Sequence, residues 1–374
     1  MAGSSNTSVT ARNLHYVIQK PPSLNMNELL ITLPGYYKEI VERLFLADWI
    51  VHNFTVKETS EFYNPANYLY NIEFDNKEYR ALLDLNVFQY IVNCVKKDSM
   101  HRLHRDACAL LVFCRAAEIQ IEPALAVYER INYNSENLKE ALDELSLLRA
   151  LDNADVEALA RYALGDKQAL QNVQPAEIDR KSLGEKLTQY YRLSNWNSIY
   201  LLVLKAAAIY WDLRVPHQKK LEHYLNWMIR EFRMSLPCIV YATRLFGHNP
   251  LPKMIKFRMD ADEHAKRTAV FNMTWDLFHI DHFFKNWIDP EHEWEEMFFT
   301  QDHMLRSLFR LAISVQYQED IAPLLKYLTS SQAKVCRAII DGAGGLEGRV
   351  YGTISWSPEH REKLIRELEE ELFY

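Results

Sequence analysis

Glycine is scarce in this chain of 374 residues, which holds only ten. None occurs between Gly35 and Gly165, and five of the ten fall between Gly342 and Gly352. Because glycine serves tight turns and left-handed backbone positions, this distribution predicts long helices joined by few tight turns. Apolar residues make up 48% and charged residues 25% of the chain, which excludes wholesale disorder and collagen-like or fibrous folds.

Cysteine is also scarce, and the five cysteines are scattered without a C-x-x-C pair. An odd, scattered set predicts neither a disulfide framework nor a zinc knuckle. Residues 1–13 lack the basic start and apolar centre of a secretory signal, and they are expected to form a mobile polar tail. We therefore expect a cytoplasmic protein.

Long apolar runs and an excess of basic residues are missing as well. The longest apolar run, residues 198–211, would span about 21 Å as a helix and contains Lys205, so no membrane segment is expected. Lys and Arg total 43 against 50 Asp and Glu, a formal net charge of -7. This balance argues against nucleic-acid binding through a broad basic surface, although a local basic groove is compatible with it.

The pattern of apolar residues predicts alternating strands and helices in two separate parts of the chain. The strands expected from alternation or from short apolar runs are residues 68–74, 79–85, 118–121 and 296–300, the first two forming a hairpin. The helices expected from apolar spacing around them are residues 36–54, 102–117, 275–287 and 303–313. Between residues 135 and 273 the periodicity is helical, and no strand is expected there.

These patterns divide the chain into six expected segments. They are a mobile tail (1–13), an N-terminal helical segment (14–67), the first half of an α/β core (68–134), a helical insertion (135–269), the second half of the core (270–315), and C-terminal helices with a glycine-rich linker (316–374). The glycines of that linker follow a helix and miss the G-x-G-x-x-G spacing, so they do not predict a phosphate loop. Ser357 is expected to cap a last helix that ends in Glu369, Glu370 and Glu371, at the negative end of its dipole.

Four acidic residues stand where ligand chemistry is expected. Asp84 ends one predicted strand and Asp302 follows another, and ligands of α/β sheets bind at the carboxyl ends of strands. Glu129 lies six residues after Pro123, near the start of a helix, and Asp276 is a charge in an apolar stretch that needs a metal or a partner. Ordinary helix caps for Asp84 and Asp302, and a solvated helix acid for Glu129, are the alternative interpretations.

Four short motifs contain these acids. They are LLDLNVF (82–88), IEPALAVYE (121–129), WDLFHI (275–280) and TQD (300–302). In this order they resemble the motifs of the PIN-domain nucleases, the family that includes the VapC-type toxin ribonucleases. The resemblance implies an α/β, helix-rich fold in which a PIN-like core with a central parallel sheet is split by an all-helical insertion.

The resemblance further implies that Asp84, Glu129, Asp276 and Asp302 form an acidic metal site, with Asn86 and Thr300 as supporting polar groups. Converging carboxylates repel one another unless a cation neutralises them, and Mg²⁺ or Mn²⁺ suits such oxygen ligands. A bound ion of this kind activates water and stabilises the charge that develops on a phosphodiester. The expected protein is a divalent-metal-dependent endoribonuclease, toxin-like or a defence effector, with RNA as its substrate and a protein inhibitor or regulator as a second partner.

Two features depart from the family pattern. The stretch between Glu129 and Asp276 is far longer than in compact toxin members, and neither the first 70 residues nor the C-terminal helices match. Three basic residues that precede the Asp276 helix are candidates to hold backbone phosphates, with solvated surface charge as the alternative: Arg258, Lys266 and Arg267.

Three rival interpretations remain open at this point. Two histidine pairs at i, i+3 spacing, His101 with His104 and His279 with His282, suit a zinc site or ordinary hydrogen bonding. The spacing of Arg258 and His264 resembles the R-x(4–6)-H motif of metal-independent HEPN ribonucleases. A catalytically inactive helical scaffold, in which the acids serve as caps, is the rival from another class of function. The motifs of zinc peptidases, esterases and P-loop ATPases are absent.

Overall fold

The computed structural model describes residues 14–18, 29–54, 62–97, 100–189, 193, 195–288, 294–345 and 357–374. The chain divides into two compact units, each of which is described by itself. Unit 1 consists of Met1–Leu187 and Glu291–Gln301, and unit 2 of Thr188–Pro290 and Asp302–Tyr374. This division differs from the segments expected from the sequence, since the helical stretch 135–269 is shared between the two units.

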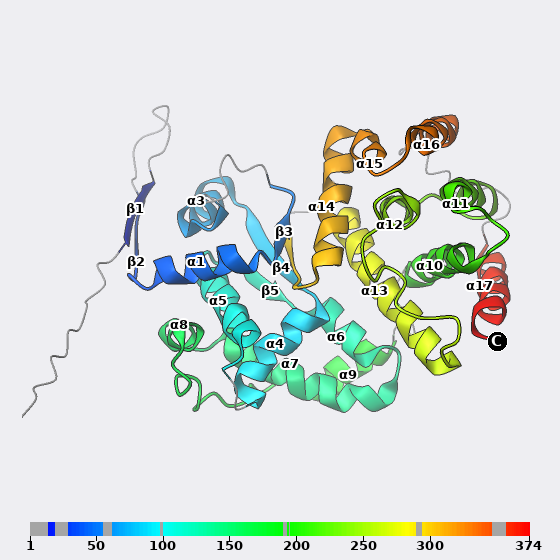
Figure 1. The fold of residues 1–374 in the computed structure, drawn as a ribbon. Helices are drawn as coiled ribbons and strands as arrows, with labels where there is room; N and C mark the ends of the chain where they lie inside the picture. Colours follow the sequence, from blue (N-terminus) through cyan, green and yellow to red (C-terminus); the bar gives the residue numbers. More distant parts are fainter. Residues whose placement is uncertain are drawn as a thin grey trace, which may run out of the picture. The chain divides into compact units, whose positions relative to one another are not determined.

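A four-stranded sheet in the order β3-β6-β4-β5 lies in unit 1 (Figure 1). Its strands are β3 (Ile50–His52), β4 (Glu78–Leu83), β5 (Gln120–Glu122) and β6 (Trp294–Phe299). β4 runs parallel to β5 and β6, whereas β3 runs antiparallel to β6. The α/β class is confirmed, whereas the sheet is small and mixed and does not show the central parallel sheet expected of a PIN-like core.

The N-terminal segment 14–67, expected to be helical, contains strands. β1 (Leu14–Ile18) and β2 (Leu29–Leu33) pair antiparallel as a separate two-stranded sheet. Residues 36–54, expected as one helix, form α1 (Tyr37–Ala47) followed by β3. The backbone of Asp48 is left-handed, with a φ of 54°, and this ends the helix before the apolar residues of β3.

The expected hairpin before β4 is also wrong. Residues 68–74 lie in α3 (Pro65–Asp75) and only β4 is a strand. The side chain of Asn64 accepts a hydrogen bond from the N–H of Ala66, and Pro65 occupies the first helical position. This cap and proline start a helix that the alternating aromatic residues alone do not reveal.

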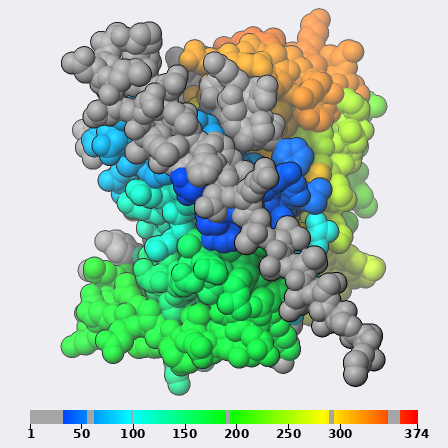
Figure 2. Space-filling model, turned by 90° about the vertical axis from the view of Figure 1, so that its left-hand side faces the viewer, coloured from blue at the N-terminus to red at the C-terminus, as the bar shows by residue number. Residues whose placement is uncertain are grey.

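The remaining helices of unit 1 include α5 (Arg102–Ala116), which matches the helix expected at residues 102–117. They are α4 (Leu85–Lys96), α5 (Arg102–Ala116), α6 (Ala124–Ile131), α7 (Leu138–Asp152), α8 (Val156–Leu164) and α9 (Arg180–Gln189), with a short 3-10 turn, η1 (Ser135–Asn137). α5 is the central helix, and it packs against α1, α4 and α8. In Figure 2 the segment that carries α8 and α9 forms the green surface at the bottom of the view.

Unit 2 is helical throughout its described residues. Its helices are α10 (Trp196–Trp211), α11 (His217–Glu231), α12 (Leu236–Phe246), α13 (Glu263–Trp287), α14 (His303–Gln318), α15 (Ala322–Leu325), α16 (Ser330–Gly342) and α17 (Pro358–Phe373). α12 is buried along its whole length and contacts α10, α11, α13 and α14 (Figure 1). Within the described part of the chain, no helix has the length and apolar character needed to cross a membrane.

The last helix, α17, begins as the sequence predicts. The hydroxyl of Ser357 accepts a hydrogen bond from the N–H of His360. Near its end, Glu369 accepts a hydrogen bond from the hydroxyl of Tyr200 at 2.6 Å and pairs with Arg267 at 3.1 Å. These donors compensate part of the negative charge that collects at the carboxyl end of the helix.

Candidate functional site

Asp84 lies at the carboxyl end of β4, where the strand passes into α4. Its N–H donates to the carbonyl of Phe299 at 3.0 Å, which extends the pairing of β4 with β6 by one residue. The residue is 5% exposed, and its Oδ1 accepts a hydrogen bond from the N–H of Asn86 at 2.8 Å. Asp84 is therefore the N-cap of α4, as the alternative interpretation expects. Its backbone bond to β6 also fixes its position at the edge of the sheet.

Thr300 binds the other oxygen of Asp84. It follows β6 directly, it is fully buried, and its hydroxyl donates to Oδ2 of Asp84 at 2.5 Å. The N–H of Thr300 donates in turn to the carbonyl of Trp49 at 2.9 Å. A hydrogen bond on each oxygen fixes the rotation of the Asp84 carboxylate. The first and last sequence motifs are thus brought into contact across 216 residues.

The side chain of Asn86 was expected to support the site, but it makes no described hydrogen bond to Asp84. Asn86 is exposed in the first turn of α4, and the contact described above comes from its backbone N–H. The amide group is therefore outside the hydrogen bonds that hold Asp84.

Glu129 is the second candidate acid of unit 1. It is half-buried on α6, and α6 packs against both β4 and α4, the two elements that Asp84 joins. The neighbouring Arg130 bonds to Glu140 at 2.7 Å and to Glu144 at 2.8 Å. These two glutamates, and not Glu129, hold the Arg130 guanidinium in the contacts described.

Asp276 lies in unit 2, half-buried on α13. The Nζ of Lys256 donates to its Oδ2 at 2.5 Å, and the two side chains are 27% and 16% exposed. The apolar sequence around Asp276 predicts a metal or a partner for the charge, and Lys256 is such a partner. The sequence analysis missed Lys256 because it lies 20 residues earlier, outside any periodic segment.

Asp302 follows Thr300 by two residues but belongs to unit 2. It is the N-cap of α14, and its Oδ1 accepts a hydrogen bond from the N–H of Leu305 at 3.0 Å. The helix cap expected for Asp302 in the alternative interpretation is therefore present. Of the four candidate acids, Asp84 and Glu129 lie in unit 1, and Asp276 and Asp302 lie in unit 2.

The three basic residues proposed for phosphate binding differ in their surroundings. Arg258 is exposed and forms two hydrogen bonds with Asp260, at 3.0 and 2.8 Å. Lys266 is only 7% exposed, although a lysine that binds a large substrate needs to reach solvent. Burial opposes the charge of Arg267, but bonds to Glu263 and Tyr374 outweigh it and raise its pKa. Arg267 is thus engaged within unit 2.

The histidines and the arginine of the rival interpretations differ in their surroundings. The Nδ1 of His101 caps α5 by accepting a hydrogen bond from the N–H of Leu103 at 3.3 Å, and His279 is buried within α13. Arg258 forms a bidentate pair with Asp260, and His264 is exposed in the first turn of α13. Arg258 and His264 both lie in unit 2, and no hydrogen bond joins them among the described residues.

The described residues contain no group of three or more His, Cys, Asp or Glu side chains that could hold a metal ion. Mg²⁺, however, is commonly bound through only one or two carboxylates, with waters and substrate phosphates completing its shell. A carboxylate oxygen can accept more than one bond, so the two hydrogen bonds described for Asp84 are compatible with a cation. A hydrated ion of this kind would need fewer protein ligands than an ion held by protein ligands alone.

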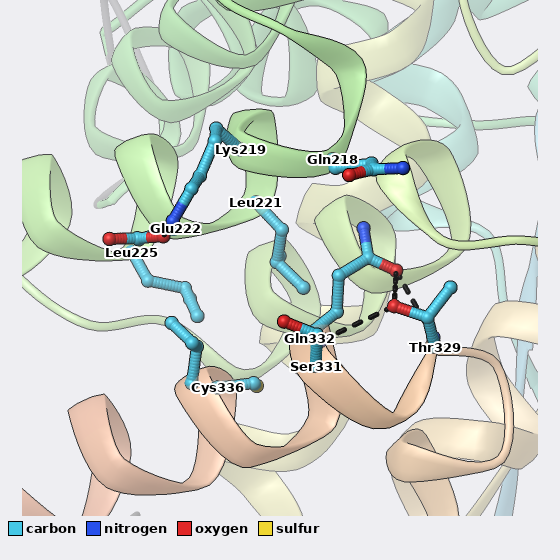
Figure 3. Close-up of a pocket in the computed structure, with 10 residues that line it drawn as sticks. Gln218, Lys219, Leu221, Glu222, Leu225, Thr329, Ser331, Gln332 and Cys336 are labelled. Atoms are coloured by element: carbon cyan, nitrogen blue, oxygen red, sulfur yellow. Dashed lines mark hydrogen bonds and ion pairs between the residues drawn. The ribbon is translucent and has the colours of Figure 1, made fainter.

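A small cavity of about 60 Å³ lies in unit 2 between α11 and α16 (Figure 3). Thr329 and Gln332 form the capping box of α16 at its edge, and Lys219 pairs with Glu222 at 2.8 Å. Its volume has room for a few water molecules and for no substrate. Gln332 also donates to the carbonyl of Phe246 at 3.0 Å, so these polar groups serve packing between helices.

A comparison of the chain with known protein families, with curated proteins and with solved structures finds no match.

Proposed function

We propose that this chain is a divalent-metal-dependent endoribonuclease that hydrolyses RNA phosphodiester bonds. The observation that carries the proposal is the buried hydrogen bond between Asp84 and Thr300 at the carboxyl ends of two parallel neighbouring strands. Each sequence motif alone is weak evidence for a nuclease. A shared site requires that the motifs of Asp84 and Thr300 meet at one edge of the sheet, which is where ligands bind in α/β folds. The contact between Asp84 and Thr300 supports the nuclease resemblance independently of the amino-acid sequence of the motifs.

In the proposed site, Asp84 and Glu129 would hold Mg²⁺ or Mn²⁺ in unit 1. When bound, such an ion supplies an activated water and neutralises charge on the phosphodiester. Thr300 is a positioning residue, because its hydroxyl orients the Asp84 carboxylate. The nuclease resemblance assigns Asp276 and Asp302 to the same chemistry, and substitution of each tests whether these residues of unit 2 take part.

The proposal is tested by cleavage of a pool of fluorescently labelled RNAs with Mn²⁺ or with EDTA. Asp84→Asn is expected to lower cleavage by about 100-fold or more, since even outer-shell partners of a metal site contribute roughly 10- to 100-fold. Asp155→Asn is the matched control, because Asp155 caps α8 in unit 1 through the N–H of Ala158 and is exposed. Asn caps a helix as well as Asp, so neither variant should unfold.

The same assay covers the unit 2 acids. Asp276→Asn and Asp302→Asn are also expected to abolish cleavage while the circular dichroism spectrum stays that of the folded protein. Retained cleavage in any two of the three variants Asp84→Asn, Asp276→Asn and Asp302→Asn would overturn the assignment of the site.

A catalytically inactive scaffold is the second candidate, and specific contacts favour it. Asp84 and Asp302 both cap helices, and Asp276 pairs with Lys256. Thermal unfolding with EDTA or Mn²⁺ separates the two functions, because an ion at 100 times its Kd stabilises the fold by about 2.7 kcal/mol. The nuclease proposal expects such a stabilisation in the wild type and its loss in Asp84→Asn. A scaffold shows none in either protein.

A further inference from the structure

A pocket of about 600 Å³ lies in unit 1 beside β5, the strand at one end of the four-stranded sheet. Its walls come from the end of α5, the turn into β5, β5 itself, the end of α7, and Arg80 on β4. Arg80 precedes Asp84 by four residues, which is about 13 Å along a strand, so this pocket is distinct from the candidate metal site. Its volume is in the range of small-molecule sites.

Three guanidinium groups from three different elements line this pocket. They belong to Arg80 on β4, Arg115 on α5 and Arg149 on α7. Arg149 donates to the carbonyl of Ile121 at 3.1 Å, on β5. An added strand would have to displace this bond, which disfavours an extended peptide as the occupant of the β5 edge.

Three carboxylates also line the pocket, but two of them are engaged. Asp152 is bonded to Arg149 at 3.4 Å, and Oε1 of Glu122 accepts a hydrogen bond from the N–H of Ala124 at 2.9 Å, where α6 begins. Glu118 is exposed at a turn with a φ of 54°. The three carboxylates equal the three guanidinium groups in number, so the arginines would bind an anion through the direction of their N–H donors and not through an excess of positive charge.

Arg80 and Arg115 keep unused hydrogen-bond donors. The guanidinium of Arg80 lies over the ring of Trp294, 3.4 Å from its centroid, and has one long bond of 3.4 Å to Glu78. Its Nε is buried without a hydrogen-bond partner among the described residues. Arg115 is exposed and forms no hydrogen bond or ion pair within the described part of the chain. A guanidinium has five donors, so the Nη groups of Arg80 and the donors of Arg115 are available to an anion.

We propose that this pocket binds the terminal phosphate of a nucleotide-sized ligand through Arg80 and Arg115. Paired guanidinium groups suit a phosphate monoester because each presents a planar fork of N–H donors to two oxygens. The stacking of Arg80 on Trp294 fixes the direction of that fork before the ligand arrives. The phosphate comes either from a free mononucleotide or from the 5′ end of a short RNA.

The proposal is tested by calorimetric titration of the full chain, in EDTA and with the Asp84→Asn variant, so that no cleavage interferes. The probes are 5′-AMP, adenosine, and one pentaribonucleotide prepared with a 5′-phosphate and with a 5′-hydroxyl. We expect 5′-AMP or the 5′-phosphorylated RNA to bind at least about 10-fold more tightly than its counterpart without phosphate, the value of one charge-assisted hydrogen bond. Whichever phosphorylated probe binds identifies the source of the phosphate.

Substitutions assign the binding to the pocket. Arg115→Gln is expected to weaken binding of the phosphorylated probe by about 10-fold or more, and Arg80→Lys to weaken it although the charge is kept. Arg161→Gln is the matched control, because Arg161 is an exposed arginine of unit 1 that pairs with Asp166 outside the pocket. Equal binding of probes with and without phosphate, no binding of any probe at about 1 mM, or unchanged binding in Arg115→Gln would overturn the proposal. None of these results depends on cleavage, so the proposed nuclease activity is judged separately.

Discussion

The described contacts of Asp84 in unit 1 differ from those of Asp276 in unit 2. In unit 1, Asp84 lies at the end of a strand, and the donors described for its two oxygens are a neutral hydroxyl and a backbone N–H. In unit 2, Asp276 is held on a helix by the ammonium of Lys256. Neutral donors orient a carboxylate without cancelling its charge, whereas a lysine partner does cancel it.

This difference teaches where a metal hypothesis is strongest. A neutral donor orients a carboxylate and does not compete with a cation for its charge. A carboxylate that already has an ammonium partner must exchange one cation for another. The following variants test what each of these contacts contributes.

The largest effect is expected from Gly247, which shows how tightly the helices of unit 2 pack. A Cβ at this position would lie 2.3 Å from the carbonyl oxygen of Tyr327 and 2.6 Å from that of Thr243. Both are backbone atoms that cannot swing away, so Gly247→Ala should lower the free energy of unfolding by about 3 kcal/mol. Urea unfolding followed by circular dichroism measures the change.

Matched glycine variants serve as controls for this effect. Gly342→Ala in unit 2 meets no atom within 4 Å, and Gly184→Ala in unit 1 meets only a side-chain carbon of Leu138 at 3.7 Å. Each is expected to be neutral or to stabilise by up to about 1 kcal/mol, since alanine favours helix. An unfolding free energy in Gly247→Ala equal to that of Gly342→Ala would contradict the close approach.

The second effect concerns the hydroxyl of Thr300. Thr300→Val keeps the shape of the side chain but removes the hydrogen bond to Asp84, so it should destabilise the protein by about 2 kcal/mol. It should also lower Mn²⁺-dependent cleavage roughly 10- to 100-fold, as loss of an outer-shell partner does. Thr300→Ser keeps the hydroxyl and should restore most of both. If Thr300→Val destabilises the fold while cleavage and Mn²⁺ affinity stay at wild-type values, the hydroxyl has no part in positioning a metal ligand.

The sequence predicted the fold well where one physical signal dominates. The buried strands β4 and β6 and most helices follow directly from apolar spacing. The predictions that were wrong are those in which a local backbone feature decides. A cap at Asn64 makes a helix of residues 68–74, and a left-handed residue at Asp48 separates α1 from β3. The antiparallel direction of β3 is set by long-range pairing with β6, which no short motif contains.

The residues of the candidate sites also divide into those that the sequence predicts and those that only the folded chain reveals. Asp84 and Thr300 could be predicted together, because both follow apolar strands and the resemblance orders them. Lys256 could not be, since its partner Asp276 is distant in sequence and only the folded chain brings them together. The arginines of the β5 pocket were missed for a similar reason. Arg80, Arg115 and Arg149 lie on three elements, and each alone is typical of an ordinary surface charge.

A smaller effect is expected from Lys256. Lys256→Met removes the partner of Asp276 and should lower the free energy of unfolding by about 1 kcal/mol, because the pair is only partly buried. The double variant Lys256→Met with Asp276→Asn should recover part of this loss, and the coupling should shrink in 1 M salt. If Asp276 binds a metal ion, Lys256→Met should tighten Mn²⁺ binding. Unchanged Mn²⁺ affinity would leave Asp276 as the structural partner of Lys256.

The smallest effect concerns Asp152 in the β5 pocket. Burial raises the pKa of Asp152, although Arg149 and Arg115 act to lower it. A carboxyl whose pKa is higher in the folded protein keeps its proton there longer, so stability falls as the pH rises through the unfolded and then the folded pKa. Asp152→Asn removes that ionisation and should stabilise the protein at pH 7 by less than about 1 kcal/mol, with the gain vanishing near pH 3.

Asp143→Asn on the same helix, where Asp143 forms an exposed pair with Arg180, is the control and should change stability little at either pH. A stabilisation that is equal at both pH values would show that burial of the charge is not its cause, and a destabilisation at pH 7 would show that the two arginines outweigh burial. In that last case Asp152, like Asp276, would be held chiefly through cationic partners.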